Sequence, residues 1–213
     1  ATDDKGVYFA WTGTSRLGNS SDDPRFIFKT GFALDMQYRS NERDRSRHAV
    51  QGDKRLVIAK HKDTWVAMLY DYVNPSASAK EAVEFSSPWL TTTIARVTPI
   101  PDDAVKIVFK AGVLGVNLAP TMPGQKKPAK PTAKGTTAWT AEVFIAWSAL
   151  GLSPGQTIRA DFGVLSADSS GMRVDTRRYW ANNEYQTVGD LAAEAMLNPR
   201  AWGTVTLGGA AKE

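Results

Sequence analysis

The chain lacks cysteine entirely and has only two histidines among its 213 residues. Without cysteine it has no disulfide bond, no thiolate metal site and no cysteine nucleophile. The histidines, His48 and His61, lie in polar stretches where no residue spacing supports a nucleophilic catalytic set. The sequence therefore favours a protein without catalytic activity. The carboxylate pair of a glycosidase leaves no spacing signature in a sequence, so that alternative stays open.

Long hydrophobic runs are missing as well. No apolar stretch approaches the roughly 18 residues that predict a membrane span. The N-terminus also lacks the basic and then apolar pattern of a signal peptide. We therefore expect no membrane span, and we expect the sequence to be a mature protein or an excised domain.

Excess positive charge is concentrated in one Pro-rich segment, residues 119–135. The net charge of the chain is +4, and four lysines of this segment account for all of it: Lys126, Lys127, Lys130 and Lys134. The rest of the chain is neutral, which argues against a nucleic-acid partner. The composition of the segment is typical of linkers, but strands of the same character are predicted on both sides of it. We therefore expect a flexible loop within a single domain of residues 1–213.

The stretch of residues 139–164 has the clearest pattern. Side chains alternate between the two faces of a strand, and one face here carries four apolar residues: Trp139, Ala141, Val143 and Ile145. Residues 147–152 then predict one helical turn that Gly151 closes. A Pro-Gly turn follows, and alternation resumes at residues 158–164. We expect a core-facing strand, a helical corner and a return strand.

Similar alternation continues along the chain. Residues 32–39 predict a strand with one core face and one polar face that carries Asp35. Other strands are predicted over residues 7–12, 55–60, 64–72, 83–85, 91–97, 104–110, 172–180 and 202–207, with a helical turn within residues 189–197. Short strands with frequent turns and one helical corner predict an all-β fold, an antiparallel β sandwich of the immunoglobulin-like or jelly-roll type.

Six short motifs add a resemblance to a known family. They are FKTG at 28–31, ALDMQ at 33–37, RLVIA at 55–59, FSSPW at 85–89, VFIAWSALGL at 143–152 and RYWAN at 178–182. Together they resemble bacterial exported proteins with a domain like the family 9 carbohydrate-binding module, in the DOMON-like group of β sandwiches. The resemblance runs from about residue 7 to residue 207. It implies a non-catalytic sugar-binding sandwich, often with structural calcium, in a periplasmic or extracellular location. Some DOMON relatives instead hold a b-type haem.

Residues 177–184 form the candidate carbohydrate site. Sugar recognition needs an aromatic face for the apolar side of a pyranose and planar polar groups for its hydroxyls. We expect Trp180 to stack on the sugar and Tyr179 to brace it, and we expect hydrogen bonds from Arg178 and the amides of Asn182 and Asn183. The alternative is that Tyr179 and Trp180 pack the end of the sandwich while the arginines are solvated.

A second stacking tryptophan is harder to assign. The resemblance implies one from an early loop, but residues 13–25 contain no aromatic side chain. Trp65, Trp89 and Tyr70 are the candidates to replace it, and each is equally well explained as a core residue.

Carboxylates for the implied calcium come from late loops. They are Asp168, Asp175, Asp190 and Glu194, with Asn182 and Asn183 as neutral oxygen ligands. Hard oxygen ligands suit Ca²⁺, although no EF-hand-like spacing is present. The alternative is that a segment such as residues 168–171 is only a turn.

Haem b would need a histidine paired with a methionine. The candidates are His48, His61, Met36, Met68 and Met172. The competing interpretation is surface histidines and core methionines. A third hypothesis is a structural or accessory module of a larger exported enzyme, whose partners would be the other domains of that protein.

Overall fold

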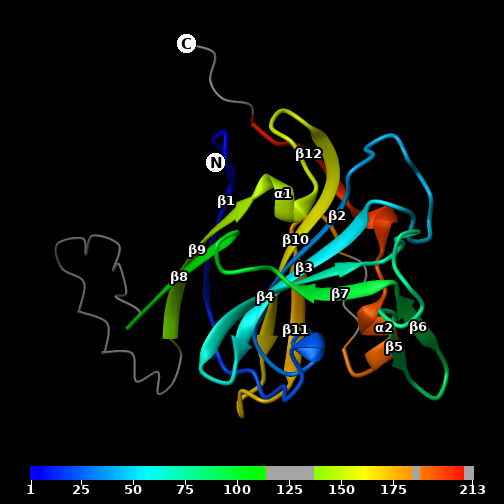
Figure 1. Cartoon of the computed structure of the whole chain (residues 1–213). Coiled ribbons are helices and arrows are strands. Elements are labelled where there is room, and N and C mark those ends of the chain that lie inside the picture. The colour runs from blue at the N-terminus through cyan, green and yellow to red at the C-terminus, as the bar shows by residue number, and fades with distance from the viewer. Residues whose placement is uncertain (114–136, 184–187, 209–213) are drawn as a thin grey trace.

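The computed structural model describes residues 1–113, 137–183 and 188–208 (Figure 1). The predicted loop of residues 119–135 lies outside this described part. Two antiparallel sheets and a separate hairpin make up the fold, which confirms the predicted all-β sandwich with a small helical part.

The larger sheet has the strand order β11-β10-β2-β3-β4-β7, and β12 pairs with β10 beside β11. Its strands are β2 (Ala33–Arg39), β3 (Asp53–His61), β4 (Thr64–Asp71), β7 (Arg96–Pro99), β10 (Thr157–Ala167), β11 (Val174–Tyr179) and β12 (Gly203–Thr206). The smaller sheet has the order β1-β9-β8. It contains β1 (Gly6–Thr14), β8 (Val105–Val113) and β9 (Thr137–Ala146).

A third unit is the hairpin of β5 (Val83–Ser86) and β6 (Thr91–Ile94). The helical elements are η1 (Pro24–Phe26), α1 (Trp147–Leu150), α2 (Leu191–Ala195) and η2 (Pro199–Ala201). In Figure 1 the smaller sheet lies to the left of the larger sheet, and the hairpin and α2 lie to its right. The predicted strand of residues 91–97 is therefore two strands, because β6 pairs with β5 whereas β7 pairs with β4.

The first core fills the space between the two sheets. β2 contributes Leu34, Met36 and Tyr38 to it. β9 contributes the whole apolar set that the sequence predicted on one face: Trp139, Ala141, Val143 and Ile145. The helical corner α1 also packs here, and the Tyr38 hydroxyl donates a 2.6 Å hydrogen bond to the carbonyl of Leu150. Gly151 ends α1 with a φ of 67°, a left-handed conformation that favours glycine.

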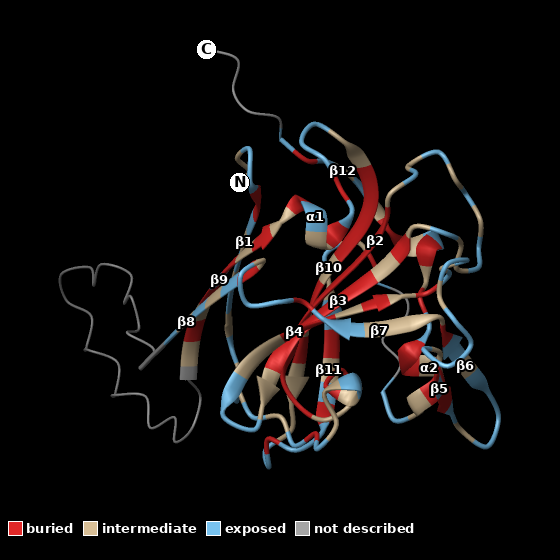
Figure 2. Ribbon diagram, in the orientation of Figure 1, coloured by how far each residue is buried: buried red, intermediate tan, exposed pale blue. Residues whose placement is uncertain are grey.

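The second core covers the opposite face of the larger sheet. Apolar residues of the hairpin and of α2, such as Phe85 and Ala195, pack there against Val57 and Met68. This cover buries the face of β2 that the sequence predicted to be polar, so all seven residues of β2 are buried (Figure 2). The polar side chains of the sheet are therefore interior groups that need partners.

Candidate functional site

The predicted sugar segment begins in the edge strand β11, and its side chains divide between the two faces of the sheet. Arg178 pairs with Val164 of β10, which packs on the first core, and Arg177 pairs with Leu165, which belongs to the second core. Arg178 therefore lies on the sandwich side and Arg177 on the side that the hairpin and α2 cover. The segment consequently contributes to two separate hollows.

An open groove of about 410 Å³ runs between the edge of the smaller sheet and the end of the larger one. Its lining combines apolar and aromatic side chains with one guanidinium: Ala10, Trp11, Phe162, Val164, Arg178, Tyr179, Trp180 and Val205. The Trp180 side chain is exposed at 57%. An exposed aromatic face in an open groove is free to stack on a ligand.

The ring of Trp180 packs against Phe162 of β10 and Gly203 of β12. Its centroid lies 6.1 Å from that of Phe162, and its backbone N–H donates a 2.8 Å hydrogen bond to the carbonyl of Phe162. Gly203 of β12 leaves room for the indole, because a Cβ at that position would lie 2.5 Å from Cζ3 of Trp180. The indole of Trp180 therefore lies against the Phe162 ring and the backbone of Gly203.

Trp11 is a groove residue that the sequence interpretation missed. It was predicted only as part of the first strand, and β1 does place it there. The structure brings Trp11 and Trp180 to the same groove from different sheets. The sequence signal for Trp11 was the alternation of residues 7–12, which predicts a strand. That signal does not place Trp11 near Trp180, because their approach depends on pairing between distant strands.

Asp161 positions the chain after Trp180. Its buried carboxylate accepts hydrogen bonds from the backbone N–H groups of Ala181 (2.8 Å), Asn182 (3.0 Å) and Phe162 (3.0 Å). Burial raises the pKa of Asp161, while these three donors act in the opposite direction. Asp161 is therefore the anchor of this turn.

A second, more polar cavity of about 360 Å³ lies on the covered face of the larger sheet. Its polar lining consists of Gln37, Arg47, His48, Arg177, Tyr179, Asn182, Glu194, Asn198 and Arg200. Asn182 therefore lies in this cavity and Trp180 in the groove, so the predicted single constellation is divided. Tyr179 lines both hollows, and Asn183 is exposed in the turn that follows.

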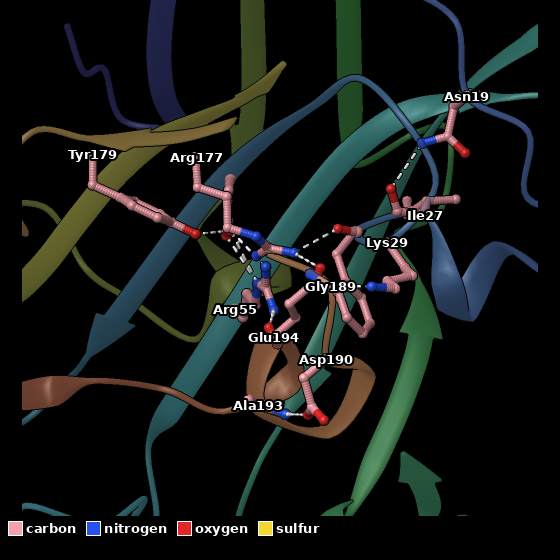
Figure 3. Close-up of polar contacts among 12 residues, drawn as sticks. Asn19, Ile27, Lys29, Arg55, Arg177, Tyr179, Gly189, Asp190, Ala193 and Glu194 are labelled. Atoms are coloured by element: carbon pink, nitrogen blue, oxygen red, sulfur yellow. Dashed lines mark hydrogen bonds and ion pairs between the residues drawn. The ribbon is translucent and has the colours of Figure 1, made fainter. Parts of the chain in front are cut away.

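A buried ionic network forms the floor beneath Tyr179 (Figure 3). The guanidinium of Arg55 donates to both oxygens of Asp35, with Nη2 2.7 Å from Oδ2, and neither side chain is exposed. The Tyr179 hydroxyl donates to the same Oδ2. Burial and the Asp35 carboxylate raise the pKa of Tyr179, which keeps the hydroxyl protonated as a donor.

Glu194 of α2 links this network to the cavity. It accepts hydrogen bonds from Arg177, from Nζ of Lys29 at 2.5 Å and from the N–H of Gly189 at 2.6 Å (Figure 3). Two cations therefore compensate one buried carboxylate.

The candidates for a second stacking residue lie outside the groove. Trp65 stacks on Phe109 with ring centroids 3.7 Å apart and packs against the first core. Tyr70 is buried, and its hydroxyl donates a 3.0 Å hydrogen bond to the carbonyl of Arg25. Trp89 is 89% exposed in the turn between β5 and β6.

The proposed calcium carboxylates have other roles in the structure. Asp168 accepts hydrogen bonds from the backbone of its own turn, and Asp190 caps α2 through the N–H of Ala193 at 2.7 Å. Glu194 is the ion-pair centre described above, and Asp175 is exposed on β11. Within the described residues, no three His, Asp or Glu side chains lie close enough together to hold a metal ion.

The candidate haem ligands are spread over the molecule. Met36 belongs to the first core and Met68 to the second, on opposite faces of the larger sheet. Met172 is exposed at 57%. Nε2 of His61 lies 3.1 Å from the carbonyl of Asp22, whereas His48 lines the polar cavity.

Fold and site define an all-β sandwich with an aromatic groove at one edge and a polar cavity under the hairpin side. Comparison with protein families, curated proteins and solved structures finds no match. Among the described residues, no helix has the length and apolar character needed to cross a membrane.

Proposed function

We propose that this protein is a non-catalytic carbohydrate-binding module whose sugar stacks on Trp180 in the groove. The observation that carries the proposal is the pairing of Trp11 and Trp180, which come from different sheets and line one open groove beside Arg178. A pyranose has one apolar C–H face and a rim of hydroxyl groups. Aromatic rings together with a planar donor match both features.

The roles that we propose in the groove differ in part from those expected from the sequence. Trp180 is the platform, Trp11 adds a second aromatic surface, and Arg178 donates hydrogen bonds to ring hydroxyls. Tyr179 braces the strand through its bond to Asp35. Asn182 supports the turn beside the platform, where its N–H is bound by Asp161.

Isothermal titration against neutral mono- and oligosaccharides tests the proposal. The wild-type protein is expected to bind at least one sugar with 1:1 stoichiometry. Trp180→Ala is expected to weaken that binding by about 30-fold, which corresponds to the roughly 2 kcal/mol of a central aromatic contact. Trp11→Ala is expected to cause a smaller loss, because Trp11 is partly buried against the first core.

Trp89→Ala is the matched control, since it removes an exposed tryptophan outside the groove. It should leave the affinity unchanged, and thermal unfolding should show that all three variants are folded. The absence of heat with every sugar would overturn the proposal and leave the accessory-domain hypothesis. Unchanged binding in Trp180→Ala would show that the sugar does not stack on Trp180.

A further inference from the structure

The polar cavity carries more positive than negative charge. Among the described residues, its charged lining consists of Arg47, Arg177 and Arg200 and one carboxylate, that of Glu194. Glu194 is already matched by Lys29 at 2.5 Å and by Arg177. Arg47 and Arg200 form no ion pair with any described residue, so the described lining keeps an excess of positive charge.

Both of these arginines stand on segments that buried arginines hold in place. Arg39 donates to the carbonyls of Ser46 (3.0 Å) and His48 (3.0 Å), on either side of Arg47. Arg159 donates to the carbonyls of Arg200 (3.4 Å) and Trp202 (3.0 Å). Arg47 and Arg200 therefore project from anchored backbone, which limits the entropy they lose on binding a ligand.

Arg177 supplies an independent indication of a ligand. Its side chain is only 4% exposed. Nη2 donates to Glu194 and to the carbonyl of Phe28 at 2.9 Å, whereas Nε is buried without a hydrogen-bond partner among the described residues. A buried donor without a partner costs free energy, and an acceptor oxygen in the cavity would relieve that cost.

We propose that this cavity binds an oxyanion group, such as a carboxylate, sulfate or phosphate, carried on a small polar molecule. Guanidinium groups match such oxygens in geometry and charge, and several arginines around one cavity favour an anion over a neutral sugar. The volume of about 360 Å³ suits a molecule of monosaccharide size. The site is separate from the groove and does not depend on sugar binding there.

Titration at constant ionic strength with four probes tests this site: inorganic sulfate, inorganic phosphate, glucuronate and neutral glucose. The wild-type protein is expected to bind at least one anion with 1:1 stoichiometry and more tightly than glucose in the cavity. Tighter binding of glucuronate would assign the oxyanion to a sugar acid. Tighter binding of sulfate or phosphate would assign it to the inorganic group or its ester.

The double substitution Arg47→Gln and Arg200→Gln is expected to weaken anion binding by about ten-fold, as two exposed charge contacts would. Both side chains are exposed, so folding should not change. Arg43→Gln is the matched control: it removes one positive charge from the same loop, and its side chain is 91% exposed outside the cavity lining. The control removes one charge and the double variant removes two, so an effect of net charge alone predicts half the loss in the control on a logarithmic scale. A loss of that size or larger in Arg43→Gln would overturn the site.

A direct readout comes from the Nε–H signal of Arg177 in ¹H–¹⁵N NMR spectra, assigned with Arg177→Lys. The signal is expected to shift on titration with the anion that binds and to stay fixed with glucose. Failure of sulfate, phosphate and glucuronate all to bind would overturn the proposal. Binding that leaves the Arg177 signal unchanged and survives the double substitution would overturn it equally.

Discussion

The hydroxyl of Tyr179 donates a 2.6 Å hydrogen bond to Oδ2 of Asp35 across the intervening strand β10. The residue between them is Gly163, which pairs with Tyr179 on one side and with Asp35 on the other. A Cβ at Gly163 would lie 2.4 Å from Cδ1 of Tyr179. The missing side chain at this position therefore lets the tyrosine ring lie over β10 and join the edge strand to a buried carboxylate.

Gly163→Ala is expected to lower the free energy of unfolding by about 1–3 kcal/mol, the usual cost of overpacking a filled site. The added Cβ would also lie 3.0 Å from the carbonyl oxygen of Arg178, and the hydrogen bond from the Tyr179 hydroxyl to Asp35 restrains the ring. Urea denaturation measures the loss. In a Tyr179→Ala background the same substitution should cost less, because the ring is gone. An equal cost in both backgrounds would show that the ring is not the obstacle.

The Asp35–Arg55 pair should be strongly coupled. Asp35→Asn leaves the fully buried guanidinium of Arg55 without its carboxylate, and we expect a loss of about 3–5 kcal/mol in the free energy of unfolding. Arg55→Met likewise leaves the buried carboxylate of Asp35 without its guanidinium partner. The double variant should lose clearly less than the sum of the two single losses, as measured by urea denaturation. Additive losses would contradict direct pairing.

Asp161 should give an unusual pH dependence. Burial raises its pKa in the folded protein, so the folded state binds this proton more tightly than the unfolded chain. The contribution of Asp161 to the free energy of unfolding is therefore full below its unfolded pKa, about 3.9, and falls as pH rises through the raised value. The difference in free energy of unfolding between wild type and Asp161→Asn should be larger near pH 3 than near pH 6.

Asp190 provides a control of opposite sign. The N–H of Ala193 is the main cause that lowers the pKa of Asp190, so its contribution is present above the unfolded pKa and is lost as pH falls. The difference between wild type and Asp190→Asn should therefore grow with pH over the same range. Urea denaturation at several pH values distinguishes the two trends, and parallel trends would show that burial does not dominate at Asp161.

Much of the fold follows from local pattern, as β9 shows. Its apolar set faces the first core as alternation predicts, and Gly151 closes the helical corner. The burial of Asp35 and Arg55 does not follow from local pattern. Alternating polar residues normally indicate a solvated face, and here the cover comes from short elements far away in sequence, the β5–β6 hairpin and α2.

The candidate site shows the same division. Trp180 was predicted to stack on a sugar from its aromatic and polar neighbours; that role stays a prediction, and the structure leaves Trp180 57% exposed. The separation of Trp180 from Asn182 results from the turn that Asp161 holds, and the approach of Trp11 depends on which edge of the smaller sheet β1 occupies. Neither relationship has a local signature, because both depend on pairings across the whole chain.

Gly203 should behave differently from Gly163, although both make room for an aromatic ring. An alanine at Gly203 would meet only the outer ring atoms of Trp180, 2.5 Å and 2.7 Å away, and this side chain is exposed and free to swing outward. We expect Gly203→Ala to change the free energy of unfolding by less than about 1 kcal/mol while it displaces the platform. The indole N–H signal of Trp180, assigned with Trp180→Phe, should shift, and sugar affinity in the groove should fall. A large loss of stability with an unmoved indole signal would mean that the ring is a fixed part of the core, and the alternative in which Trp180 packs the end of the sandwich would then hold.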